Sequence, residues 1–186
     1  MHVEKMNGLK GRLIRSDSKL RRQHGASLLE GIAYLGIAAI VVLGAISLLT
    51  GAFSSAKSNQ ATEEVIGLRT AVRKLYMGQT YPTTGVVATL ITAKAAPGTL
   101  AQDSGAGTLK NSWGGTVDIA GSGTGFTITY NAVPQDVCVS MLSGANGWTQ
   151  VQANAGTAIT DFPVTANAAT TACSSATSNT VVYTSS

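Results

Sequence analysis

Histidine, aromatic residues and charged residues are all scarce in this chain, and each scarcity limits its function. The 186 residues include two histidines, His2 and His24, which both lie within the first 25 residues. A chain that loses those residues has no imidazole, the commonest general base and the commonest nitrogen ligand of metals. Charged residues make up 12% of the sequence and aromatic residues 5%. Small residues dominate instead, which favours close packing and loop-rich β structure.

Positive charge is lacking from most of the chain because it is concentrated at the start. Residues 1–25 hold seven basic and two acidic residues, and the remainder holds six basic and seven acidic residues. A nucleic-acid-binding protein needs a basic face on its folded part, and this distribution provides none. A basic block before a hydrophobic segment instead indicates retention on the cytoplasmic side of a membrane.

A long uncharged run follows the basic block. Residues 32–49 carry no charge, and Glu30 is the one charged residue in the wider stretch 26–53. About 20 apolar residues cross a bilayer as a helix, so this stretch predicts a transmembrane helix whose C-terminal side faces away from the cytoplasm. A cleaved secretory signal is the alternative, with a small-x-small site at residues 54–56. The run is longer than an ordinary signal core.

Apolar and small residues continue at helical spacing beyond the run and predict one stripe of an amphipathic helix. The stripe consists of Ala61, Val65, Leu68, Val72 and Leu75. Charged side chains are expected largely on the other faces: Glu63, Glu64, Arg69, Arg73 and Lys74. Gly78 and Pro82 are expected to end the helix. One helix is therefore predicted from about Ala26 to Met77, hydrophobic all round in 26–53 and amphipathic in 54–77.

The chain after Pro82 has the pattern of a small antiparallel sheet. Residues 86–94 are expected to form a short helix, and 153–179 a long surface loop. Alternating runs bounded by glycine predict strands at 116–119, 126–130, 137–141, 148–151 and 180–183. Burial of the helix stripe against this sheet gives an α+β fold, with a hydrophobic half of the helix protruding from a globular head.

The two cysteines, Cys138 and Cys173, lie far beyond the hydrophobic run, where an exported domain would be. A single disulfide in an oxidising compartment is expected, with two unrelated buried thiols as the alternative. Closing the loop between them would stabilise the head by roughly 3–4 kcal/mol in the chain-entropy model.

The remaining candidate residues of the head are its aspartates and tryptophans. The aspartates lack the spacing of a calcium-binding loop, so neither a metal nor a cofactor is expected. They are Asp103, Asp118, Asp136 and Asp161. Trp113 is expected to pack the sheet onto the helix rather than to recognise a ligand, and Trp148 is a candidate surface contact.

The start of the chain resembles the class III signal of type IV pilins. The resemblance rests on the basic leader, Gly25, the sequence ASLLE at residues 26–30 and the apolar helix. In that family a membrane peptidase cuts after the glycine, and the hydrophobic run is kept. The leader of 25 residues, the two-cysteine loop and the stretch NSWGGTVDI are similar to the type IVb subclass, and within it to major pilins of thin conjugative-type pili.

The resemblance implies roles for three residues. The peptidase would cut between Gly25 and Ala26, and the new amino group of Ala26 would meet Glu30 of a neighbouring copy. A lone buried carboxylate is costly, so this pairing would fix the axial register of the subunits. The alternative is that Glu30 lies at the headgroup boundary and only stabilises the helix N-terminus. The family usually methylates a new N-terminal Phe or Met, and Ala26 departs from that pattern.

The resemblance also implies a structural protein and not an enzyme: a major pilin that is polymerised into a surface filament for adhesion, aggregation or mating contact. It implies a leader at 1–25, an assembly helix at 26–53 and a pilin head at 54–186. Before assembly the protein would cross the inner membrane once, with its head in the periplasm. The implied partners are further copies, the prepilin peptidase, an assembly ATPase with its inner-membrane platform, an outer-membrane secretin, and a tip adhesin or minor pilin.

Two other functions fit parts of the pattern. A pseudopilin of a type II-like secretion system would have the same fold, although some pseudopilins bind calcium through clustered acids. A membrane-anchored periplasmic enzyme is the other alternative, which the absence of histidine after residue 25 disfavours.

Overall fold

The computed structural model describes residues 27–186, which fall into two units that divide between Leu43 and Gly44. Helix α1 spans Leu28–Leu75 and contains 48 residues, which confirms the predicted long helix. Ser27 begins this helix, because its Oγ accepts a hydrogen bond from the Glu30 backbone N–H at 3.2 Å. A serine in this position satisfies one of the backbone N–H groups that a helix leaves without a partner.

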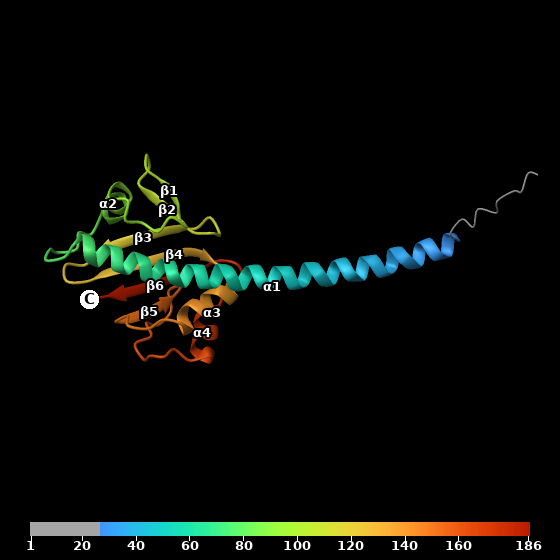
Figure 1. The fold of residues 1–186 in the computed structure, drawn as a ribbon. Coiled ribbons are helices and arrows are strands. Elements are labelled where there is room, and N and C mark those ends of the chain that lie inside the picture. Colours follow the sequence, from blue (N-terminus) through green and yellow to red (C-terminus); the bar gives the residue numbers. More distant parts are fainter. Residues whose placement is uncertain (1–26) are drawn as a thin grey trace, which may run out of the picture. The chain divides into compact units, whose positions relative to one another are not determined.

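The second unit is built on one antiparallel sheet of six strands, ordered β1-β2-β3-β4-β6-β5 (Figure 1). The strands are β1 (Ala101–Asp103), β2 (Thr108–Lys110), β3 (Thr116–Gly121), β4 (Phe126–Val133), β5 (Gln150–Ala153) and β6 (Asn179–Ser185). Strand β6 lies between β4 and β5, with both of which it pairs antiparallel. The last strand of the sequence is therefore an interior strand of the sheet.

The second half of α1 packs on this sheet and forms the core with it (Figure 1). Ala61, Val65, Leu68 and Val72 are buried, so the predicted stripe is confirmed, and Leu75 is half-buried at its end. Strands β3 and β6 alternate between buried and more exposed side chains, as expected when one face of a sheet is covered. The α+β class is confirmed.

Three shorter helices complete the head: α2 (Val86–Thr92), α3 (Gln135–Ser143) and α4 (Ala166–Ala172). Helix α2 confirms the prediction for 86–94. The strand predicted at 137–141 is wrong, because these residues lie in α3. The buried residues of α3 are Val137, Cys138, Met141 and Leu142, which recur at helical spacing rather than at every second position.

The loop predicted at 153–179 is also wrong in part, because it contains α4. Thr165 begins this helix: its side chain accepts a hydrogen bond from the Ala168 backbone N–H at 3.3 Å. The hairpin of β1 and β2 was not predicted. Its strands have three residues each, and the side chains of β1 are all exposed, so no hydrophobic alternation marks them.

Candidate functional site

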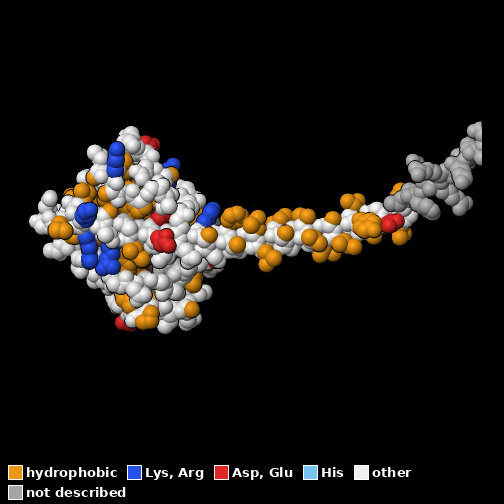
Figure 2. Space-filling model, viewed as in Figure 1, with side chains coloured by type: hydrophobic (Ala, Val, Ile, Leu, Met, Phe, Trp, Pro, Cys, Tyr) orange, Lys and Arg blue, Asp and Glu red, His pale blue; other side chains and the backbone are white. Residues whose placement is uncertain are grey.

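Residues 28–53 present apolar side chains on every side of α1. All of them are exposed except half-buried Gly31, and Figure 2 shows hydrophobic side chains along this part of the helix. Its large apolar side chains include Leu28, Ile32, Leu35, Val41 and Phe53. Soluble proteins rarely expose a continuous apolar surface of this extent, which marks a membrane or protein contact. By length and composition α1 can also cross a membrane.

Glu30 is the one charged residue on this apolar surface. It lies in the first turn of α1 and its side chain is exposed. A negative charge there interacts favourably with the helix dipole. Ser27 supplies the hydrogen bond that begins the helix, so this role does not fall to the carboxylate of Glu30.

The proposed cleavage site lies outside the described residues, which begin at Ser27. Cleavage after Gly25 and the pairing of Ala26 with Glu30 stay predictions.

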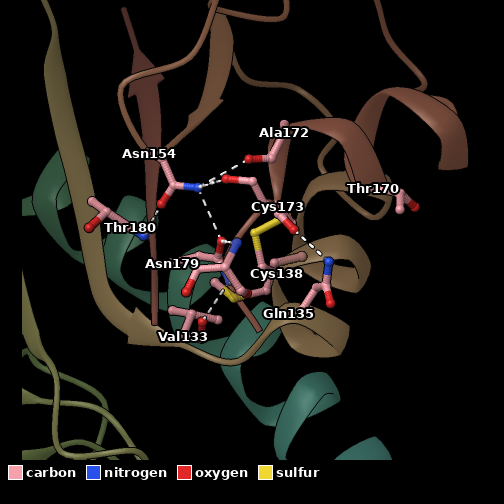
Figure 3. The surroundings of a disulfide bond; sticks show 12 residues. Val133, Gln135, Cys138, Asn154, Thr170, Ala172, Cys173, Asn179 and Thr180 are labelled. Carbon is pink, nitrogen blue, oxygen red and sulfur yellow. Dashed lines mark hydrogen bonds between the residues drawn. A yellow bond between two sulfur atoms is a disulfide. The ribbon is translucent and has the colours of Figure 1, made fainter. Parts of the chain in front are cut away.

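The predicted disulfide is confirmed (Figure 3). Cys138 in α3 and Cys173, directly after α4, form a disulfide with their Cα atoms 5.9 Å apart. Both cysteines are fully buried. The bond joins two cysteines that are 35 residues apart in sequence, links α3 to the end of α4, and holds the segment after β5 against the head.

Two asparagines next to the disulfide secure the start of β6 (Figure 3). Asn179 is fully buried and donates from its side chain to the carbonyl oxygens of Val133 (3.1 Å) and Ser175 (2.6 Å). Asn154 donates to the carbonyl oxygen of Ala172 (3.1 Å) and to Oδ1 of Asn179 (3.1 Å). Asn154 has a φ of 55°, a left-handed conformation that asparagine tolerates better than most residues. The disulfide is therefore embedded in a hydrogen-bonded network.

Arg69 and Trp148 form a stacked pair between α1 and the sheet. The Arg69 guanidinium lies 4.7 Å from the centre of the Trp148 ring and donates a hydrogen bond to the carbonyl oxygen of Gly147. Burial lowers the pKa of Arg69, and the neighbouring charge of Arg73 lowers it further. Trp148 is only 7% exposed, so its prediction as a surface contact is wrong.

Arg73 and Trp113 also contact their own chain. Arg73 donates to Oγ of Ser185 (3.0 Å) and to the carbonyl oxygen of Ser186 (2.6 Å), which fastens α1 to the end of β6. Trp113 is half-buried and packs against the core, in keeping with a packing role.

Glu64 is a functional candidate that the sequence analysis missed. It was expected away from the buried stripe, but its side chain is 3% exposed. Position 64 follows Ala61 by three residues and precedes Leu68 by four, a spacing that places it on the same face and that could have identified it. Glu64 adjoins Tyr130: burial raises the pKa of Tyr130 above its usual range, and the charge of Glu64 raises it further.

Comparisons with known proteins agree on one family. The family model described as "PilS N terminal" matches residues 55–186. The major structural subunit of bundle-forming pilus from Escherichia coli O127:H6 is 28% identical over 181 residues, covering 87% of this chain and 93% of that protein. A crystal structure of a type IVb pilin from Salmonella typhi is 33% identical with a TM-score of 0.56, covering 67% of this chain and 97% of that one.

Proposed function

The chain belongs to the PilS N-terminal family and is a type IVb pilin, a structural subunit and not an enzyme, and from this premise we propose how it matures and assembles. The protein is made as a precursor with a leader at 1–25, which a prepilin peptidase removes between Gly25 and Ala26. The mature subunit begins with the assembly helix 26–53 and continues into the head at 54–186.

The exposed apolar surface of residues 28–53 supports this proposal most directly. A helix that is apolar on every side is stable only in lipid or among other apolar helices. Before assembly the helix lies in the inner membrane, with the basic leader in the cytoplasm and the head in the periplasm. During assembly it leaves the lipid and packs among the same helices of other copies, so the extracellular filament has an apolar interior.

Glu30 sets the position of each copy along the filament. In the apolar interior its carboxylate needs a cation, because an unpaired buried charge costs several kcal/mol. The amino group that cleavage creates on Ala26 is available in every subunit. Pairing of this amine with Glu30 of a neighbouring copy neutralises both charges in one axial register only.

Energy and export come from partners that this chain does not encode. An ATPase with its inner-membrane platform adds each subunit, and the filament passes through an outer-membrane secretin. A tip adhesin or minor pilin adds to the filament, which serves adhesion, aggregation or mating contact. A pseudopilin of a secretion system remains the second candidate by fold, but the two relatives described above are both named as pilus proteins or pilins.

N-terminal sequencing of the subunit from sheared filaments tests the proposal. The expected sequence is ASLLEGIAYL, which starts at Ala26. A start at residue 1 would show that the leader is retained, and a start beyond residue 53 would show that the apolar helix is discarded. Either result would refute the proposed maturation.

A further inference from the structure

Glu64 is the one charged side chain that is buried among the described residues. Its Oε1 accepts a hydrogen bond from the side-chain nitrogen of Gln60 at 2.8 Å. The same nitrogen also donates to Oγ of Ser112 at 3.3 Å. Gln60 is neutral, so the carboxylate receives a hydrogen bond without any compensation of its charge.

Tyr130 is a second buried residue beside Glu64 that carries a polar group. Its hydroxyl is fully buried and lies next to the Glu64 carboxylate, without a hydrogen bond of good geometry to it. Burying a carboxylate without a cation is strongly unfavourable. The isolated subunit therefore contains a polar cluster whose charge is uncompensated.

A hollow of about 210 Å³ adjoins this carboxylate and leads to the surface of the head. It is lined by Gln60, Glu63, Glu64, Gly67 and residues 97–99. Glu63 is exposed, whereas Glu64 is buried. The lining contains two acids and neither lysine nor arginine, so the hollow is suited to a cation.

We infer that this hollow receives the ammonium group of a lysine from a second copy of the chain. The inference rests on the assembly proposed above. In the filament the lysine side chain enters the hollow, and its ammonium group pairs with Glu64, with Glu63 adding negative charge. The charge of the Glu64 carboxylate is costly in the free subunit, and the pairing compensates it in the filament. The pairing therefore favours assembly.

The chemistry of the described residues favours lysine over arginine or a metal ion. Both arginines, Arg69 and Arg73, are engaged with their own chain. The lysines of the head are exposed and none lines the hollow: Lys57, Lys74, Lys94 and Lys110. A metal ion needs several ligands, and no group of three His, Cys, Asp or Glu residues in the described part of the chain could hold one.

Zero-length cross-linking of intact filaments tests the pairing directly. A carbodiimide joins a carboxylate to an amine only when the two are in contact. We expect mass spectrometry to find a peptide that links Glu64 to a lysine of another copy in filaments, and to find none in detergent-solubilised subunits. Mixed filaments of isotopically light and heavy subunits distinguish a link between copies from a link within one. The absence of an intermolecular link at Glu64 would overturn the inference.

Glu64→Gln, compared with Glu63→Gln, supplies a second test. Glutamine keeps a hydrogen-bond acceptor for Gln60 and removes the charge, so the melting temperature of the solubilised subunit should stay unchanged or rise. Filament yield should fall at least about tenfold, because the lysine of the second copy loses its partner. Glu63→Gln should reduce the yield much less.

Three outcomes of this comparison would overturn the inference: wild-type yield for Glu64→Gln, an equal loss for both variants, or a fall in melting temperature together with yield. The last outcome would assign Glu64 to the stability of the head alone. In each case, wild-type filaments whose subunits start at Ala26 would leave the proposed maturation intact.

Discussion

Two buried tyrosine hydroxyls of the head differ in their hydrogen bonding. The Tyr183 hydroxyl donates to the carbonyl oxygen of Met141 at 2.9 Å, whereas the Tyr130 hydroxyl has no partner among the described residues. Tyr183→Phe should therefore lower the free energy of unfolding by about 1–3 kcal/mol, because it leaves a buried carbonyl unsatisfied. Tyr130→Phe is the matched control and should be neutral or slightly stabilising.

Urea unfolding of detergent-solubilised subunits measures this difference, since both tryptophans lie in the head and report its unfolding by fluorescence. Equal losses for the two variants would contradict the assignment of the hydrogen bonds.

The same tyrosines predict a loss of stability in alkali. Burial raises the pKa of Tyr183 and of Tyr130 above the usual value of about 10. Above that pH the unfolded chain releases protons that the folded head retains, so the free energy of unfolding falls by up to about 1.4 kcal/mol per pH unit for each tyrosine. Unfolding measured at increasing pH should show this slope, and Tyr183→Phe should reduce it. A free energy of unfolding that is constant above about pH 10 would count against the burial of these hydroxyls.

Glu30 acts after maturation, so its replacement should separate processing from polymerisation. Glu30→Gln should still yield a mature subunit, but filament yield should fall at least about tenfold, because the Ala26 amine is left unpaired in an apolar interior. Immunoblots of whole cells and of sheared filaments measure the two steps. Filaments at normal yield would support the alternative, in which Glu30 only stabilises the helix N-terminus.

At the scale of elements, local sequence patterns predicted the helices and strands whose periodicity is continuous. They missed the helices and strands whose pattern is short or mixed. Helix α1 was predicted because its stripe repeats over many turns. The stretch 137–141 has alternating apolar residues, and only the longer window of α3 shows helical spacing. Helix α4 has seven residues and only Ala169 among them is buried, so no apolar stripe and little beyond the capping Thr165 marks it.

The disulfide is the strongest link between two of these elements, α3 and α4. Cys138→Ser with Cys173→Ser should lower the free energy of unfolding by roughly 3–4 kcal/mol, because the unfolded chain regains the freedom of a long loop. Urea unfolding and protease resistance measure the effect. Reduced wild-type protein is the control and should match the double variant. Equal resistance with and without reductant would show that the bond contributes little.

At the scale of the whole molecule, the sequence predicted the class of fold and the family resemblance but not the order of the strands. The class follows from one long helix and several short alternating runs. The place of β6 between β4 and β5 depends on pairing between distant segments, which no local pattern reveals. The pairing of Ala26 with Glu30 likewise depends on a second copy and remains a prediction.

Maturation of the whole protein should depend on a single glycine of the leader. Gly25→Ala should leave an uncut precursor, longer by 25 residues and retained with the membrane fraction, because the resemblance places the peptidase cut at this residue. Gly11→Ala, in the same leader, is the matched control and should be processed. Immunoblots after membrane fractionation distinguish the two lengths, and a normal mature band for Gly25→Ala would refute the peptidase assignment.

The interior place of β6 has a consequence for biosynthesis. The ribosome delivers α1 about 100 residues before β6, so a nascent head holds β4 with one bare edge until the final segment arrives. An unpaired strand edge exposes backbone N–H and C=O groups that can pair with strands of other chains. Truncated polypeptides that end before β6 should therefore aggregate, and quality-control proteases should degrade them as misfolded protein.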